Sequence, residues 1–400
     1  SGLLWAQSFL PAYEENWAQW RGPYDNSVAP EGNPPLEWSE SSNIKWKSEI
    51  PGVGHATPIV WKDQIILLSA VQTDQKARPE EKGEAQDWMN PRSTEYIHKF
   101  VVISVDRNSG QIQWQTTVRE ELPYSHTHEF GSWASNSPVT DGEFIYAYFG
   151  SHGLYCLDLQ GNLIWERDLG RMEKHMSFGE GSSPVLYKDK LIVLRDHQGP
   201  SMLHVLNKEN GESIWEVERD ETTSWSTPAV IEYNGAVQLI TNATNRIRSY
   251  DLETGNIIWE CSGMTRNVIP SPLYARGTVY LMSGFRGYAL LAISLLRASG
   301  DISGTNAILW AYDKNTPYTP NAILMDGLLY FLKTNNGYLS CLDAGDGTEY
   351  YSNVRVEGIK NIFTSPVGVD DRIYIVGTNG ICAVVKTGKT YELLAQNTLD

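Results

Sequence analysis

A Ser-Pro or Thr-Pro dipeptide recurs along this chain at a nearly constant interval, and this repeat constrains the fold more than any other feature. Successive spacings are 80, 46, 44, 44, 48 and 46 residues, measured between Pro58, Pro138, Pro184, Pro228, Pro272, Pro320 and Pro366. A fixed period of this length indicates a repeat architecture, in which each unit buries its apolar surface against its neighbours. The first spacing is long because residues 71–97 form an insertion in the first repeat.

Each repeat has the pattern of four short strands. The third repeat reads SSPVLY, KLIVLRD, MLHVLN and ESIWEVE, and a short Gly-containing turn precedes its last strand. Such turns supply the positive φ that a tight hairpin needs. Four-stranded units that recur seven times predict a β-propeller, because a sandwich does not require so many near-equal units.

The repeats also resemble a known family. The pattern SP-x-V-x-x-G-x-(I/V)-Y, followed by LY-x-LD-x-x-G-x-x-x-W, resembles the PQQ-like repeat over residues 44–400. This resemblance implies an all-β propeller of four-stranded antiparallel blades, with the tryptophan packed between adjacent blades. A tryptophan buries up to about 250 Å² and its indole N–H can reach a neighbouring carbonyl. We therefore expect a structural, inter-blade role for Trp46, Trp114, Trp165, Trp215, Trp259 and Trp310; Tyr350 and Tyr391 take roughly this place in the last two repeats.

The start of the chain bears on the number of blades. An additional tryptophan-containing segment at residues 44–50, NIKWKSEI, precedes the first complete repeat and is interpreted as an outer strand. It predicts an eight-bladed propeller with an incomplete last blade; a seven-bladed ring with one extra edge strand is the alternative. Residues 1–43 are an N-terminal extension. Its apolar, uncharged residues 1–10 are interpreted as a signal-peptide remnant, with an ordered extension as the alternative.

Functional residues are expected on one rim of the propeller. The connections between the second and third strands, and between consecutive repeats, are long and varied, whereas the other turns are short. Elaborated loops on a rigid scaffold are where binding tends to reside. Polar and cationic side chains there suit a carboxylate, a sulfate or a sugar; alternatively, they satisfy buried loop backbone. The ligand-binding candidates are His126, His128, Glu129, His197, Trp225, Asn245, Arg246 and Arg286. A cavity at the channel mouth lined by His197, Arg246 and Arg286 is the specific expectation.

Cofactor chemistry has weak support in the sequence. His126, His128 and Glu129 are types that ligate metals, but spacing assigns no third and fourth ligand, so no metal is predicted. Quinoprotein dehydrogenases have PQQ-like repeats, and that resemblance would imply PQQ with calcium. The chain has no adjacent cysteine pair, no haem motif and no segment that matches their calcium and catalytic residues. No cofactor is predicted, and PQQ with calcium stays an alternative.

The repeats are also similar to those of the propeller lipoprotein of the outer-membrane barrel assembly machinery, which binds protein partners. We therefore expect a binding or scaffold module for a small polar ligand, a glycan or another protein. The sequence contains no complete set of catalytic residues that would indicate an enzyme. A quinoprotein-type oxidoreductase and a carbohydrate-binding or carbohydrate-active propeller are the alternatives; Glu129 and Glu180 are the carboxylates named for hydrolysis. The segment WAQWRGPYDNS resembles an exported bacterial branch, which implies a periplasmic or extracellular location.

Charge and cysteine usage narrow these classes further. The formal net charge of −16 argues against a nucleic-acid partner, because phosphate binding needs a basic patch, and no apolar stretch is long enough for a transmembrane segment. Cys156, Cys341 and Cys382 occupy equivalent positions in different repeats, so they are expected to be small buried thiols.

Overall fold

The computed structural model describes residues 11–78 and 95–399, and these residues form an all-β fold. The helical turns among them are short: α1 (Pro11–Glu14), η3 (Gly150–His152) and η4 (His175–Ser177). No helix in the described part of the chain has the length and apolar character needed to cross a bilayer. The chain divides into an N-terminal unit (Glu15–Trp20 and Trp46–Thr223) and a C-terminal unit (Ser1–Glu14, Arg21–Lys45 and Ser224–Asp400).

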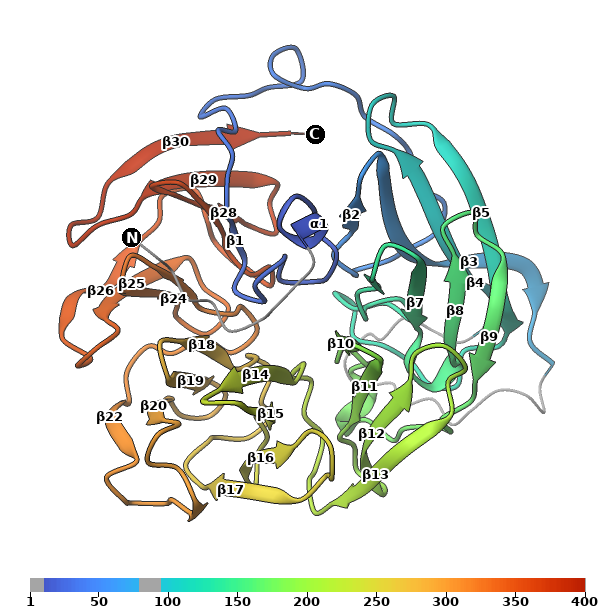
Figure 1. The fold of residues 1–400 in the computed structure, drawn as a ribbon. Coiled ribbons are helices and arrows are strands. Elements are labelled where there is room, and N and C mark those ends of the chain that lie inside the picture. Colours follow the sequence, from blue (N-terminus) through green and yellow to red (C-terminus); the bar gives the residue numbers. More distant parts are fainter. Residues whose placement is uncertain (1–10, 79–94, 400) are drawn as a thin grey trace. The chain divides into compact units, whose positions relative to one another are not determined.

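The N-terminal unit contains three four-stranded antiparallel sheets, whose strands follow one another in chain order (Figure 1). The first sheet comprises β2 (Ile59–Trp61), β3 (Gln64–Lys76), β4 (Tyr96–Asp106) and β5 (Ile112–Glu121). The second comprises β6 (Val139–Thr140), β7 (Phe144–Tyr148), β8 (Leu154–Asp158) and β9 (Leu163–Arg167). The third comprises β10 (Val185–Tyr187), β11 (Lys190–Arg195), β12 (Ser201–Asn207) and β13 (Ser213–Arg219).

The C-terminal unit contains four sheets of the same kind, two of which carry an additional strand. The first comprises β14 (Ala229–Tyr233), β15 (Ala236–Thr241), β16 (Ile247–Asp251), β17 (Ile257–Cys261) and the parallel edge strand β21 (Gly300–Asp301). The second comprises β18 (Leu273–Ala275), β19 (Thr278–Ser283), β20 (Ala289–Ser294) and β22 (Ile308–Tyr312). The third comprises β23 (Ile323–Met325), β24 (Leu328–Leu332), β25 (Tyr338–Asp343) and β26 (Glu349–Arg355). The fourth comprises β27 (Val367–Val369), β28 (Arg372–Val376), β29 (Ile381–Lys386) and β30 (Leu393–Thr398), with β1 (Val28–Ala29) parallel to β27.

The sheets share one irregularity. In all seven, the pairing of the third and fourth antiparallel strands shifts register near the start of the fourth strand, as between Val205 and Leu206. A bulge of this kind bends the strand and increases its local twist. It lies beside the Gly-containing turn that the repeat predicts, so the turn chemistry and the bulge recur together.

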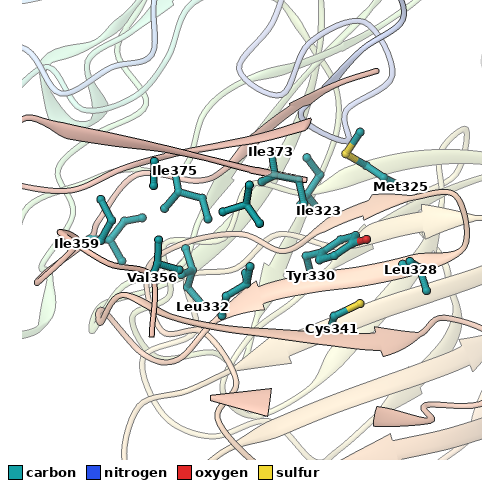
Figure 2. Packing of buried hydrophobic residues seen from close by; sticks show 14 residues of the cluster. Ile323, Met325, Leu328, Tyr330, Leu332, Cys341, Val356, Ile359, Ile373 and Ile375 are labelled. Carbon is teal, nitrogen blue, oxygen red and sulfur yellow. The ribbon is translucent and has the colours of Figure 1, made fainter. Parts of the chain in front are cut away.

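The apolar core lies between consecutive sheets within each unit. Figure 2 shows one such layer in the C-terminal unit, where Tyr330 and Leu332 of β24 face Ile373 and Ile375 of β28, all of them fully buried. Both faces of each inner strand are apolar, which accounts for continuous buried runs such as Leu328–Leu332. A sheet with two apolar faces must be covered on both sides, and stacking against neighbouring sheets provides this cover.

Several tryptophans dock onto a neighbouring sheet through one repeated contact. Each indole Nε1 donates to a carbonyl oxygen in the third-to-fourth-strand turn of the next sheet: Trp46 to Arg107 (3.0 Å), Trp114 to Leu159 (3.1 Å), Trp165 to Lys208 (3.0 Å) and Trp310 to Ala344 (3.2 Å). A glycine of that turn lies against the ring in each case: Gly110, Gly161, Gly211 and Gly347. Trp259 differs, because it is fully buried and donates to Gln238 of its own sheet. Trp215 is half-buried on β13.

Two features of the chain differ from the expectations. Residues 44–50 form no strand, although Trp46 makes the tryptophan contact, and the described residues form seven sheets, so the eight-bladed count is not confirmed. The insertion is shorter than 71–97, because β3 continues to Lys76 and Lys76 pairs with Tyr96 of β4. The remainder of the insertion and the signal-remnant residues 1–10 lie outside the described residues.

Candidate functional site

Two long loops of the N-terminal unit pack against each other on the expected loop-rich rim. They are residues 122–138, which follow β5, and residues 168–184, which follow β9. The Asn136 Nδ2 atom donates to the Ser182 carbonyl at 2.6 Å, and the Ser137 amide donates to the Ser183 hydroxyl at 2.9 Å. A Cβ atom at Gly179 would lie 3.5 Å from Thr127. These contacts hold the two loops as one surface.

Four ring side chains and a methionine lie on this surface, and we call them the rim patch: His128, Phe130, His175, Met176 and Phe178. The His128 ring lies 5.5 Å from Phe130 and 5.3 Å from Phe178, and Phe178 lies 6.2 Å from His175. Phe130 is 54% exposed and Met176 is 39% exposed. The rim patch therefore presents two large apolar side chains to solvent beside rings that pack in tilted and edge-to-face arrangements.

The backbone under the rim patch is strained. Met176 and Ser177 have φ values of 54° and 53°, in the left-handed region that side chains other than glycine rarely adopt. Each such residue costs of order 1 kcal/mol and persists only where its surroundings enforce it. The amide of the preceding residue, His175, donates to the Thr223 hydroxyl at 3.0 Å. The surroundings thus keep Met176 in an unfavourable backbone conformation in which its residue surface is 39% exposed.

The sequence candidates His126, His128 and Glu129 differ in their exposure and in their hydrogen bonds. His126 is buried, Glu129 is exposed, and the Nδ1 atom of His128 accepts a hydrogen bond from the Phe130 amide at 3.2 Å. Across residues 11–78 and 95–399, no group of three His, Cys, Asp or Glu side chains could hold a metal ion. Sequence reasoning missed Phe130 and Met176, because an apolar residue in a loop gives no signal of its exposure.

Behind the rim patch, β5 and η3 form a charged network. The Glu121 carboxylate receives hydrogen bonds from Arg119 Nε at 2.9 Å and from His152 Nδ1 at 2.7 Å. Burial raises the pKa of Glu121, but these donors outweigh it, so the pKa lies below its usual range. The His152 ring stacks on Phe100 at 4.2 Å. The network fixes the end of β5, from which the first rim loop starts.

His197 lies in a second polar cluster, on the loop between β11 and β12. Its Nδ1 atom accepts from the Glu173 and Gly199 amides at 3.2 and 3.1 Å, and burial lowers its pKa. Next to it, Asp196 and Arg219 form a fully buried ion pair with an Nε–Oδ1 distance of 2.8 Å. These contacts match the alternative reading, in which the loop's polar residues satisfy buried backbone and pair with each other.

Lys174 completes that cluster. Its Nζ atom donates to the Asp196 carbonyl at 2.6 Å, and burial lowers the pKa of Lys174 to about 8. Glu180, one of the two carboxylates named for hydrolysis, accepts from both the amide and the hydroxyl of Ser151. The Glu180 carboxylate is therefore occupied by η3, whereas Glu129 is exposed on the other rim loop.

The remaining candidates belong to the C-terminal unit. The Arg246 Nη1 atom lies 3.0 Å from Asp301 on β21, the edge strand of its sheet, so its head group points to the outer edge rather than to the inner strand expected at a channel mouth. Arg286 is exposed and lies over the Phe285 ring at 5.5 Å. The Trp225 amide donates to the Val268 carbonyl at 2.8 Å, and Asn245 is exposed.

Comparison with known proteins places the chain in a family. A family model described as outer membrane protein assembly factor BamB matches residues 98–353, which is more than half of the chain. The chain belongs to the BamB family. No curated protein matches its sequence.

Solved structures extend the comparison to the BamB fold. BamB from Moraxella catarrhalis is 14% identical, with a TM-score of 0.50, covering 83% of this chain and 90% of that one. A europium-containing methanol dehydrogenase is 12% identical, with a TM-score of 0.64 and coverages of 97% and 86%. The computationally designed Ika8 protein is 13% identical, with a TM-score of 0.50 and coverages of 76% and 84%. At such low identity these likenesses establish the propeller fold of this BamB-family chain and nothing finer.

Proposed function

We propose that this BamB-family protein is a binding module that docks a partner protein through the rim patch. The observation that carries the proposal is the exposure of Phe130 and Met176 on two loops that are locked together. Solvent-facing apolar clusters rimmed by polar residues mark interaction surfaces. Aromatic residues and methionine are also enriched in the buried centres of protein interfaces.

The chemistry of the rim patch favours an apolar segment of the partner. Met176 is unbranched and polarisable, so it can adapt its contacts to an incoming aliphatic or aromatic side chain. Phe130 offers a rigid ring with few rotatable bonds, which lowers the entropy lost on binding. His128 and His175, which both pack against Phe178, add polar ring nitrogens to the rim patch.

The proposal includes export of the protein. The family is described by its role in the assembly of outer membrane proteins, and the segment WAQWRGPYDNS resembles exported bacterial chains. A periplasmic or extracellular location is consistent with both. Fractionation of cells that produce the full-length protein tests this part: recovery of the protein in the cytoplasmic fraction alone would contradict it.

Site-specific cross-linking tests the docking surface. A photoreactive amino acid at position 130 should give one dominant adduct in the native cells, and Met176→Glu in the same protein should abolish it. Position 296 is the matched control, because Leu296 is 71% exposed but lies in a short turn after β20. The proposal fails if position 130 gives no adduct beyond that seen at position 296, or if Met176→Glu leaves the adduct unchanged.

A further inference from the structure

A cavity of about 380 Å³ opens at the loop-rich end of the β2–β5 sheet. We call it the rim cavity. Its walls come from the segment before β2, the facing ends of β3 and β4, and the loop after β5. It is lined by Gly52, Val53, Ala70, Gln72, Glu95, Tyr96, His98, Ser132 and Trp133. This size lies within the range of small-molecule sites, which are typically of about 300–1,000 Å³.

One wall of the rim cavity is a fixed aromatic ring. The Trp133 Nε1 atom donates to the Ser125 carbonyl at 2.7 Å, and the ring lies 4.6 Å from the His98 ring. Trp133 also packs against the apolar core of its sheet. Tyr96 supplies a second aromatic side chain. The aromatic surface is thus in place before any ligand arrives, which reduces the ordering cost of binding.

The polar groups of the rim cavity are mostly unused. Within the described residues, the Gln72 amide, the Glu95 carboxylate and the Tyr96 hydroxyl make no hydrogen bond. The His98 Nδ1 atom must donate to the Tyr96 carbonyl, 2.8 Å away, because a carbonyl can only accept. Burial lowers the pKa of His98, so the ring is neutral at pH 7 and its Nε2 atom is an acceptor.

The distribution of charge narrows the ligand class. Among the described residues that line the rim cavity, Glu95 is the only charged one and none is a lysine or arginine, which disfavours an anion. A cationic ligand is also disfavoured, because Lys76 already lies over the Tyr96 ring at 5.5 Å. The acceptors Glu95, His98 Nε2 and the Gln72 carbonyl require a neutral ligand with several donors.

We propose that the rim cavity binds a neutral saccharide ring, with its C–H face against Trp133 and its hydroxyl groups on Gln72 and Glu95. Such a ring combines an apolar face with several hydroxyl donors, which is the combination that these walls present. The proposal goes beyond partner docking, because the rim cavity and the rim patch have no residue in common. Of the carboxylate, sulfate or sugar expected from the sequence, it selects the sugar, in a cavity that the sequence did not indicate.

Calorimetric titration of the full chain tests the proposal. The ligands are glucose, galactose, N-acetylglucosamine and maltose, with glucuronate and tetramethylammonium as charged comparisons. At least one neutral sugar should bind and change the tryptophan fluorescence. Gln72→Ala should weaken that binding about fivefold, the effect of one neutral hydrogen bond. Gln75→Ala is the matched control on the same strand, and it should bind as the wild type does.

The outcomes separate this proposal from partner docking. Phe130→Asp should leave sugar affinity unchanged, so loss of the partner and loss of the sugar are independent results. The saccharide proposal is overturned if none of the neutral sugars binds, or if only glucuronate or tetramethylammonium binds. It is equally overturned if the sugars bind Gln72→Ala as tightly as the wild type, because the ligand would then occupy another place.

Discussion

The indole Nε1 of Trp114 donates a 3.1 Å hydrogen bond to the carbonyl oxygen of Leu159, which lies 45 positions later in the chain. The Cα atom of Gly161, in the same turn, packs against the indole ring. A Cβ atom at this position would lie 2.6 Å from the nearest ring carbon. One contact therefore couples the last strand of a sheet to the turn of the next sheet. Its recurrence sets the distance between stacked sheets in each unit.

Gly161→Ala should destabilise the protein by about 2–4 kcal/mol. A left-handed φ of +85° costs an alanine about 1 kcal/mol, and the overlap with Trp114 adds about 1–3 kcal/mol. Gly235→Ala is the matched control, because Gly235 has a φ of +80° and no atom within 4 Å of the added Cβ. Urea unfolding followed by tryptophan fluorescence measures both variants. Equal losses would show that the tryptophan contact contributes nothing.

The sequence predicted the sheets well because their determinants are local. Alternating apolar residues, the Gly-containing turn and the Ser/Thr-Pro start recur in each repeat, and each fixes its own segment. The structure of residues 44–50 is not determined by their own sequence pattern. Trp46 makes its contact with Arg107 from a segment that forms no strand. A tryptophan in a strand-like pattern indicates that its side chain is packed against the protein. It does not indicate that its backbone is hydrogen-bonded to a neighbouring strand.

The candidate site was harder to predict for a physical reason. The pattern of polar residues pointed to the long loops, but in the structure Arg246 is paired with Asp301, and His197 is held by two backbone amides. Polar residues in a loop bind backbone and each other as readily as a ligand. The exposure of Phe130 depends on how two loops pack, and the cavity around Trp133 depends on how a loop packs against β3 and β4; no local pattern encodes either.

Asp196→Asn should destabilise the protein by about 3–5 kcal/mol, because it leaves the Arg219 guanidinium buried without its counter-charge. The exposed pair of Arg246 and Asp301 is the comparison, and Asp301→Asn should cost less than about 1 kcal/mol. Chemical denaturation of both variants at one pH gives the two values. A small loss for Asp196→Asn would mean that water reaches the pair and that its burial is incomplete.

The Glu121 network should make stability depend on pH in the acid range. The folded-state pKa of Glu121 is lowered, so its contribution is complete above about pH 5 and is lost as the pH falls through the folded pKa. The free energy of unfolding of the wild type should exceed that of Glu121→Gln most at pH 6–7, and this difference should shrink toward pH 3. Denaturation of both proteins across this range measures it; a difference that grows on acidification would contradict the assignment.

The four cysteines should be unreactive in the native protein. All are buried and free, and burial raises the pKa of Cys341 and Cys382 to about 11 and that of Cys156 to about 12. Because the thiolate is the reactive form, a thiol reagent at pH 8 should label none of them within minutes. In concentrated guanidinium all four should react. Rapid labelling of one thiol in the native state would show that its part of the core opens.

The affinity of the cross-linked partner for the purified protein tests the docking surface most directly. We predict that Phe130→Asp weakens binding by at least about tenfold, since an apolar anchor at an interface centre contributes more than about 1 kcal/mol. Leu296→Asp, which alters an exposed leucine away from the rim patch, should bind as the wild type does. Equal affinities for wild type and Phe130→Asp would contradict the proposed function.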